Sequence, residues 1–169
     1  MSETDDARRD RMFISIDAAR KEDVSAIIKI SSEGGLSEWS SASYLAEIER
    51  TDSIFYTASN ATGNIVGFLC GRTAAAPDKE ESLEAWIYNV GVFVEYRERG
   101  VGSTLIRAFF DRCRSQGVDS AWLEVRKNNA RAISFYRGHD FREVYSRANF
   151  YTDPADDALI LSARINLKA

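Results

Sequence analysis

Residues 97–105, Arg-Glu-Arg-Gly-Val-Gly-Ser-Thr-Leu, decide the fold of this chain. The residues before them, Val90-Gly91-Val92-Phe93-Val94, have the apolar character of a strand, and an apolar helical pattern begins directly after the glycines. A strand that turns through glycines into a helix leaves backbone N–H groups without intrahelical partners, where the helix dipole adds partial positive charge. Arg97 and Arg99 add full positive charge. The stretch therefore predicts an anion-binding turn that suits a phosphate-bearing cofactor.

The glycine spacing separates this turn from two common phosphate-binding motifs. No Gly-Lys-Ser/Thr follows, which excludes the ATP-binding P-loop. The third glycine of the dinucleotide-binding fingerprint is also missing, because Thr104-Leu105 continues the chain instead. A simpler interpretation is that the glycines only give a strand–helix turn the flexibility it needs. The remainder of the chain has to distinguish these two interpretations.

The composition of the 169 residues indicates one domain of ordinary globular type. Hydrophobic residues make up 44% of the chain and charged residues 28%. The net charge of −4 argues against binding to nucleic acid. No apolar run is long enough to span a membrane, and residues 1–11 lack the apolar core of a signal peptide. We predict a disordered tail over 1–11, a single domain over 12–169 and a cytoplasmic location, with no nucleic-acid or membrane partner.

The cysteine and histidine content narrows the chemistry further. Cys70 and Cys113 both lie in apolar patterns and form no Cys-x-x-Cys motif, which predicts buried free thiols and a reducing compartment. His139 is the only histidine, so a metal site with several histidines is excluded, and we expect no metal.

Hydrophobic periodicity predicts an α/β fold with a mixed, mostly antiparallel sheet of about seven strands flanked by about four helices. The predicted order is strand, two helices, three strands, helix, strand, helix and two strands. The strands are expected at 13–16, 54–58, 65–72, 83–94, 118–125, 141–146 and 158–165. Gly91 indicates a bulge or a close backbone approach within its strand. Loops are expected at 73–82 and 149–154, and Asn128 or Asn129 should cap the last helix.

Three stretches, in this order, resemble the GNAT superfamily of N-acetyltransferases. Residues 97–102 match its pyrophosphate loop, Arg/Gln-x-x-Gly-x-Gly/Ala. Residues 122–136, Trp-Leu-Glu-Val-Arg-Lys-Asn-Asn-Ala-Arg-Ala-Ile-Ser-Phe-Tyr, are similar to a stretch of bacterial ribosomal-protein alanine N-acetyltransferases and their archaeal and eukaryotic relatives. The same holds for 147–151, Arg-Ala-Asn-Phe-Tyr, with Asp-Asp-Ala at 156–158. The resemblance covers about residues 13–165 and implies a GNAT-like fold.

The chain departs from the family pattern at a few positions. Asp140 stands where the family usually has a glycine, and an aspartate can adopt the left-handed backbone conformation only at some cost. Phe150 replaces the first of two paired tyrosines, Val94 replaces a proline, and the loop at 73–82 is longer than in compact relatives. These differences bear on the choice of substrate more than on cofactor binding.

The resemblance implies that acetyl-CoA is bound by backbone and side-chain groups from three segments. Backbone groups of Val90, Gly91 and Val92 would pair with the pantetheine arm and polarise the thioester carbonyl. The pyrophosphate would be held by Arg99, Gly100, Val101, Gly102 and Ser103, and Arg97 and Glu98 of the same turn are also expected to take part in cofactor binding. Asn129 would form a hydrogen bond with the pantetheine arm.

The resemblance also implies two catalytic residues. Glu124 would be the general base, acting directly or through a water, and Tyr136 would be the general acid that protonates the coenzyme A thiolate. Each residue has a purely structural alternative. Glu124 could be a solvated strand carboxylate or form a salt bridge with Arg126, and Tyr136 could be a packed helix tyrosine.

The implied reaction is transfer of an acetyl group to a primary amine, above all to a protein N-terminal α-amine. Trp39, Phe150 and Tyr151 are expected to line the substrate groove, although packing is the more common role of aromatic residues. Two alternatives remain open: an acetyltransferase for small amines such as an amino acid, polyamine or antibiotic, and a non-catalytic acyl-CoA sensor that would need neither Glu124 nor Tyr136. The expected partner is a protein N-terminus or a small amine, and the expected state is a monomer or homodimer.

Overall fold

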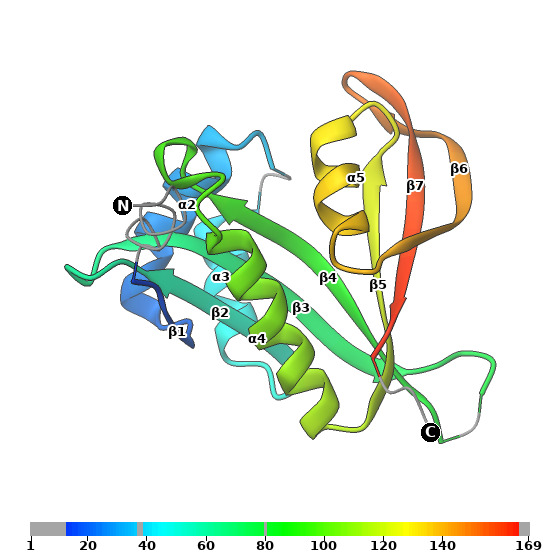
Figure 1. The fold of residues 1–169 in the computed structure, drawn as a ribbon, viewed down its shortest axis with the longest axis horizontal. Helices are drawn as coiled ribbons and strands as arrows, with labels where there is room; N and C mark the ends of the chain where they lie inside the picture. Colours follow the sequence, from blue (N-terminus) through cyan, green and yellow to red (C-terminus); the bar gives the residue numbers. More distant parts are fainter. Residues whose placement is uncertain (1–12, 37–38, 80, 166–169) are drawn as a thin grey trace, which may run out of the picture. The chain divides into compact units, whose positions relative to one another are not determined.

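The predicted order of elements is confirmed in a computed structural model, which describes residues 13–36, 39–79 and 81–165 (Figure 1). The tail predicted over 1–11 lies outside the described residues. The elements are β1 (Ser15–Ala18), η1 (Lys21–Asp23), α2 (Val24–Glu33), α3 (Ser41–Ile48), β2 (Ser53–Ser59), β3 (Ile65–Ala75), β4 (Leu83–Val92), η2 (Val94–Tyr96), α4 (Val101–Ser115), β5 (Val118–Arg126), α5 (Ala130–Arg137), β6 (Arg142–Thr152) and β7 (Ala155–Arg164).

The strands form one seven-stranded sheet in the order β1-β2-β3-β4-β5-β7-β6. β4 and β5 are parallel, whereas the pairs β1 with β2, β5 with β7 and β6 with β7 are antiparallel. This confirms the predicted α/β class with a mixed sheet. Contacts between residues divide the chain into two compact units, which are described separately: residues 1–70 with 89–109, and residues 71–88 with 110–169.

The first unit has an aromatic core between its helices and strands. Tyr44 on α3 is fully buried, and its ring lies 5.8 Å from that of Phe68 and 5.9 Å from that of Phe55. The Tyr44 hydroxyl shares a hydrogen bond of 3.2 Å with the Ser31 hydroxyl, so the buried polar group is satisfied. Burying side chains of this size stabilises the fold by roughly 1.5–3 kcal/mol each.

Gly91 in β4 lies against this core, which confirms the predicted close backbone approach. A Cβ atom at this position would lie 2.8 Å from Cγ2 of Ile30 and 2.8 Å from Cε1 of Phe68. Such distances are shorter than van der Waals contact, so only glycine lets β4 approach α2 and β3 this closely.

The second unit is built on β5, β7 and β6, with α5 beside them (Figure 1). Ala121, Leu123 and Val125 of β5 are buried, whereas Trp122 and Glu124 lie on the opposite face and are partly exposed. This alternation confirms the two faces expected from the sequence. Both cysteines are buried and neither is in a disulfide, as predicted, and burial raises the pKa of the Cys113 thiol to about 12.

The predicted loop over 149–154 is wrong, because β6 continues to Thr152 and only Asp153 and Pro154 form the turn. The pairing of β6 with β7 shifts between Arg147 and Tyr151, and Asn149 has a positive φ of 53°. The polar character of this stretch therefore marks a bulge within the strand. β3 likewise extends to Ala75 and shortens the loop expected at 73–82.

Asp140 adopts the left-handed conformation that its position in the turn after α5 requires, with φ at 65°. The departure from glycine therefore preserves the turn.

Within the described residues, no helix combines the length and apolar character needed to cross a membrane.

Replacing Gly91 by Ala is expected to lower the free energy of unfolding by about 1–3 kcal/mol, because an added methyl group forces packed neighbours to move. Urea unfolding measures this loss. Gly138→Ala is the matched control. Gly138 has an ordinary φ of −63°, and the nearest atom to its added Cβ is a backbone oxygen at 3.3 Å. The control should change stability by less than about 0.5 kcal/mol. Equal losses in both variants would contradict the close-approach argument.

Candidate functional site

The turn before α4 has the geometry predicted for an anion site. Glu98 and Gly100 both have positive φ, at 60° and 84°. The first i to i−4 bond of the helix runs from the Thr104 N–H to the Gly100 carbonyl at 3.0 Å, and the Thr104 hydroxyl donates to the same oxygen at 2.9 Å. The N–H groups of Val101 and Gly102 precede that bond and have no acceptor within the helix. They are therefore the donors that a phosphate group could use.

The two arginines of this turn differ in what they contact. The Arg97 side chain is half-buried, and its Nε donates to the Val92 carbonyl at 3.0 Å, which ties the turn to the end of β4. Arg99 is exposed and forms no hydrogen bond or ion pair within the described part of the chain. Arg99 is thus the guanidinium that could pair with an anion. Ser103 follows on the first turn of α4, where its side chain is partly exposed.

Buried and partly exposed residues alternate in the segment of β4 that is expected to bind the cofactor. Val90 and Val92 are partly exposed on either side of buried Gly91. The carbonyl of Val92 already accepts the bond from Arg97. Pairing of this segment with a pantetheine arm therefore remains a prediction.

In the second unit, Glu124 presents a partly exposed carboxylate on β5. Its side chain is 28% exposed, and its Oε1 accepts a hydrogen bond from Nη1 of Arg147 on β6 at 3.1 Å. The salt bridge to Arg126 considered from the sequence is not formed. Arg126 instead lies over the Tyr151 ring, 4.1 Å from its centroid, and donates to the carbonyls of Pro154 at 2.7 Å and Asp153 at 3.1 Å.

Phe150 and Tyr151 lie beside the two arginines of this region, Arg147 and Arg126. Their rings are 5.1 Å apart, and the Arg147 guanidinium lies 5.7 Å from the Phe150 ring. Burial first, and the Glu124 carboxylate second, raise the pKa of Tyr151 above its ordinary value, while Arg126 opposes the rise. Of the three aromatic residues predicted to line a substrate groove, Tyr151 is thus close enough to Glu124 to be affected by its charge, and Phe150 is linked to Glu124 through Arg147.

The third predicted aromatic residue, Trp39, packs on the core of the first unit. Its ring lies 5.4 Å from that of Tyr44, and its side chain is half-buried. The position is compatible with the packing role expected of most aromatic residues, and a role in substrate binding stays a prediction.

Helix α5 carries the remaining two candidates, Asn129 and Tyr136. Asn129 is the N-cap, and its Oδ1 accepts from the Ala132 N–H at 3.1 Å, which leaves its amide N–H groups as donors outside the cap. Tyr136 packs with Phe135 and Phe141 at ring distances of 5.3 and 5.7 Å. Burial raises the pKa of Tyr136 above its ordinary value, so its phenol keeps its proton.

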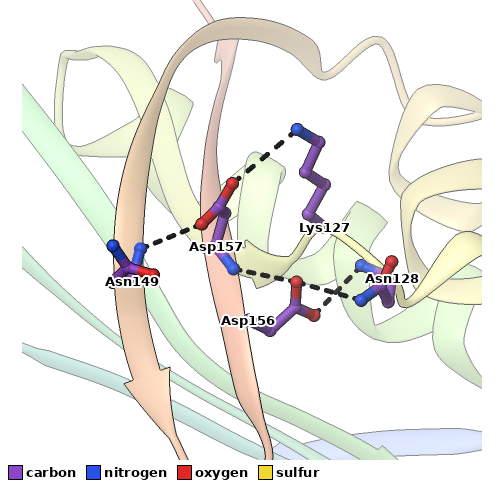
Figure 2. Close-up of polar contacts among 5 residues, drawn as sticks. All are labelled: Lys127, Asn128, Asn149, Asp156 and Asp157. Carbon is purple, nitrogen blue, oxygen red and sulfur yellow. Dashed lines mark hydrogen bonds and ion pairs between the residues drawn. The ribbon is translucent and has the colours of Figure 1, made fainter.

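Two adjacent carboxylates, Asp156 and Asp157, tie three segments of this unit together (Figure 2). Asp156 accepts from the Asn128 N–H at 3.1 Å and from the Asn128 side-chain amide at 3.2 Å. Asp157 accepts from the Asn149 N–H at 2.9 Å and lies 3.7 Å from the Lys127 ammonium. The start of β7 thereby holds both the loop before α5 and the bulge in β6.

Sequence reasoning did not assign a role to Arg147, although it lies in the third motif that was recognised. Arg147 on β6 and Glu124 on β5 meet across β7, which lies between these two strands. Glu124 lies opposite Ile160 of β7, and Arg147 lies opposite Ala158 of the same strand. No spacing in the chain indicates that contact. The available signal was the position of Arg147 at the start of the third motif, Arg-Ala-Asn-Phe-Tyr at 147–151.

Comparisons with known proteins show what this chain is similar to. The model of the acetyltransferase (GNAT) family matches residues 24–141. The chain is 37% identical over 86 residues to the [ribosomal protein bS18]-alanine N-acetyltransferase of Escherichia coli strain K12, a match that covers 50% of this chain and 58% of that protein. It therefore spans little more than half the length of that curated relative.

Other matches extend over more of the chain. A putative [ribosomal protein bS18]-alanine N-acetyltransferase of Bacillus subtilis strain 168 is 29% identical over 147 residues, covering 87% of this chain and 93% of the relative. The crystal structure of the ribosomal-protein-S18-alanine N-acetyltransferase from Escherichia coli superposes with a TM-score of 0.77 at 26% identity, covering 93% and 97% of the two chains.

Replacing Asp157 by Ala is expected to lower the free energy of unfolding by about 1 kcal/mol, because the Asn149 N–H loses its acceptor. The exchange of that amide hydrogen with solvent should also become faster, which NMR measures directly. Glu143→Ala is the control, since Glu143 is an exposed carboxylate on the same β6 strand and has no partner among the described residues. Unchanged exchange at Asn149 in Asp157→Ala would show that the bulge does not depend on Asp157.

The raised pKa of Tyr136 gives a pH dependence with a definite sign. Below the unfolded-state pKa of about 10, the phenol is protonated in both the folded and the unfolded protein, and the contribution of Tyr136 to stability is fully present. As the pH rises from there through the folded-state pKa, the unfolded protein loses this proton first, so the contribution to stability is lost. Stability should therefore fall less steeply above about pH 10 in Tyr136→Phe than in the wild type. Urea unfolding across the alkaline range measures the free energy of unfolding of each protein, with Tyr145→Phe as the control at an exposed tyrosine. Parallel curves for wild type and Tyr136→Phe would contradict the buried-phenol argument.

Proposed function

This chain belongs to the acetyltransferase (GNAT) family, and we propose that it transfers an acetyl group from acetyl-CoA to a protein N-terminal α-amine, with a ribosomal protein as the candidate acceptor. The observation that carries the acceptor class is the sequence similarity over 87% of this chain and 93% of a relative named for ribosomal-protein alanine N-acetylation. An α-amine has a pKa near 8, against about 10.4 for lysine, so a modest base suffices to neutralise it.

The residues of the first unit fit the phosphates of acetyl-CoA. The Val101 and Gly102 N–H groups lie before the first helical bond of α4, Gly100 supplies the left-handed turn, and Arg99 has an uncommitted guanidinium. Arg97 would act indirectly, by holding the turn against Val92 through its hydrogen bond. When bound, acetyl-CoA supplies a thioester as the acetyl donor.

Glu124 is the proposed general base. Arg147 donates a hydrogen bond to one of its carboxylate oxygens, and the other, Oε2, accepts none from the described residues. Oε2 would take a proton from the protonated acceptor amine, directly or through a water, before the amine attacks the thioester carbonyl. The resulting neutral amine nitrogen carries the lone pair that forms the new amide bond.

Tyr136 is the proposed general acid. Its phenol is protonated at neutral pH, as that of an ordinary tyrosine is, and its hydroxyl forms no hydrogen bond within the described part of the chain. The proton is therefore available to the thiolate that departs as the carbon–sulfur bond breaks. Asn129, with its amide N–H groups outside the helix cap, would donate to the pantetheine arm. Backbone groups of Val90, Gly91 and Val92 would polarise the carbonyl.

Glu124→Gln is expected to lower turnover by about 10²-fold or more with little change in acetyl-CoA affinity, because a general base typically contributes 10²–10⁴-fold. Release of the coenzyme A thiol measures turnover, using peptides with free or blocked α-amines, including the N-terminal sequence of a ribosomal protein, and a panel of small amines. Glu143→Gln removes a carboxylate from the exposed β6 strand and serves as the matched control, with turnover close to that of the wild type.

The acceptor panel separates the possible functions. Thiol release with a free α-amine that disappears when the amine is blocked supports the proposal. Release only with small amines would replace the acceptor class, and binding of acetyl-CoA without release under any condition would contradict an enzymatic role. Full turnover in Glu124→Gln would remove Glu124 from its proposed role.

A further inference from the structure

We propose that Arg147 is a positioning residue that orients the Glu124 carboxylate for proton transfer, an inference that rests on the proposed function. The observation behind it is an asymmetric carboxylate. Oε1 of Glu124 is held at 3.1 Å by Nη1 of Arg147, whereas Oε2 accepts no hydrogen bond from the described residues. One oxygen is thus fixed by the protein and the other is left for the acceptor.

The sheet register explains why these two side chains meet. Glu124 on β5 lies opposite Ile160 of β7, and Arg147 on β6 lies opposite Ala158 of the same strand. Side chains of directly opposed residues stand on the same face of an antiparallel pair, so both project over β7. The small side chain of Ala158 leaves room for the long arginine side chain to cross that strand.

Arg147 is itself held in place by its neighbours. Its guanidinium lies 5.8 Å from the centroid of the Tyr145 ring and 5.7 Å from that of the Phe150 ring, and Nη2 donates to the Tyr145 hydroxyl at 3.4 Å. A guanidinium that contacts two aromatic rings loses much of its freedom before it meets the carboxylate. It can therefore impose an orientation on Glu124 instead of merely following it.

Stability does not account for this ion pair. The Arg147 and Glu124 side chains are 47% and 28% exposed, and ion pairs at such exposure contribute little to folding. Arg126, the nearer arginine in the sequence, is committed to the Tyr151 ring and to the carbonyls of Pro154 and Asp153. The pairing with Arg147 is therefore specific, and it holds a carboxylate that presents its other oxygen to the acceptor.

The test is a double-mutant cycle on the full chain, using thiol release with the best peptide acceptor. Arg147→Ala should lower kcat about tenfold or more with a smaller change in KM, because a misplaced catalytic group costs rate more than ground-state binding. Arg147→Lys should recover most of that loss by restoring a cation beside Oε1. In the Glu124→Gln background, Arg147→Ala should have no further effect on kcat.

Two controls keep the experiment decisive. Arg164→Ala removes an exposed arginine of β7 that has no partner among the described residues, so it reports the effect of charge alone and should leave kcat unchanged. Urea unfolding of each variant identifies any loss of folding, and Arg147→Gln serves if Arg147→Ala does not fold.

The outcomes separate this inference from the proposed function. Equal losses from Arg147→Ala in the wild-type and Glu124→Gln backgrounds would overturn the positioning role, as would a loss confined to KM or no loss at all, while leaving the acetyltransferase proposal intact. Absence of thiol release by the wild-type protein with every acceptor would instead overturn the proposed function. A tenfold loss that lysine restores and that vanishes without the Glu124 carboxylate supports the inference.

Discussion

The hydrogen bonds accepted by Asp156 and Asp157 are the constraint on which the candidate site of the second unit depends. These carboxylates stand at the start of β7 and bind the loop before α5 through Asn128 and the bulge of β6 through Asn149. The loop leads directly to the Asn129 cap and so to the helix that carries Tyr136. Backbone N–H groups that leave a regular ladder need another acceptor, and carboxylates supply stronger hydrogen bonds than neutral groups. The placement of side chains from three segments therefore follows from two adjacent residues.

Four arginines of this chain contact different groups, because each has different surroundings. Arg97 braces the phosphate turn through the Val92 carbonyl, and Arg126 closes the hairpin between β6 and β7 by donating to its turn. Arg147 holds the carboxylate of Glu124, and Arg99 has no partner among the residues that the structure describes. Guanidinium groups suit all these tasks, because their planar fork of donors can meet carbonyls, carboxylates, rings or phosphates. The surroundings of each arginine decide which of these it meets.

Sequence reasoning succeeded where local physics controls the structure. The alternation of Ala121, Leu123 and Val125 with Trp122 and Glu124 predicted the two faces of β5, because side chains alternate along any strand. It failed at 149–154, where the polar residues suggested a loop. The acceptor that stabilises the bulge at Asn149 is the Asp157 side chain, and no local propensity predicts the partner of an irregular N–H group. At Gly91 the prediction was partly successful. The sequence indicated a close approach of the backbone, but it did not indicate that α2 and Phe68 are the groups that approach.

By itself, the sequence determined the order of strands and helices, the glycine turn with its helix N-terminus, and the candidate residues Glu124 and Tyr136 through their resemblance to a family. These depend on periodicity, turn chemistry and short motifs, which neighbouring residues encode. Only the tertiary structure decided that Glu124 pairs with Arg147 instead of Arg126. Arg126 and Glu124 share one strand face, yet Arg126 is drawn to the carbonyls of the β6–β7 turn and to the Tyr151 ring. Arg147, by contrast, reaches Glu124 only because β7 sets the register of both strands beside it.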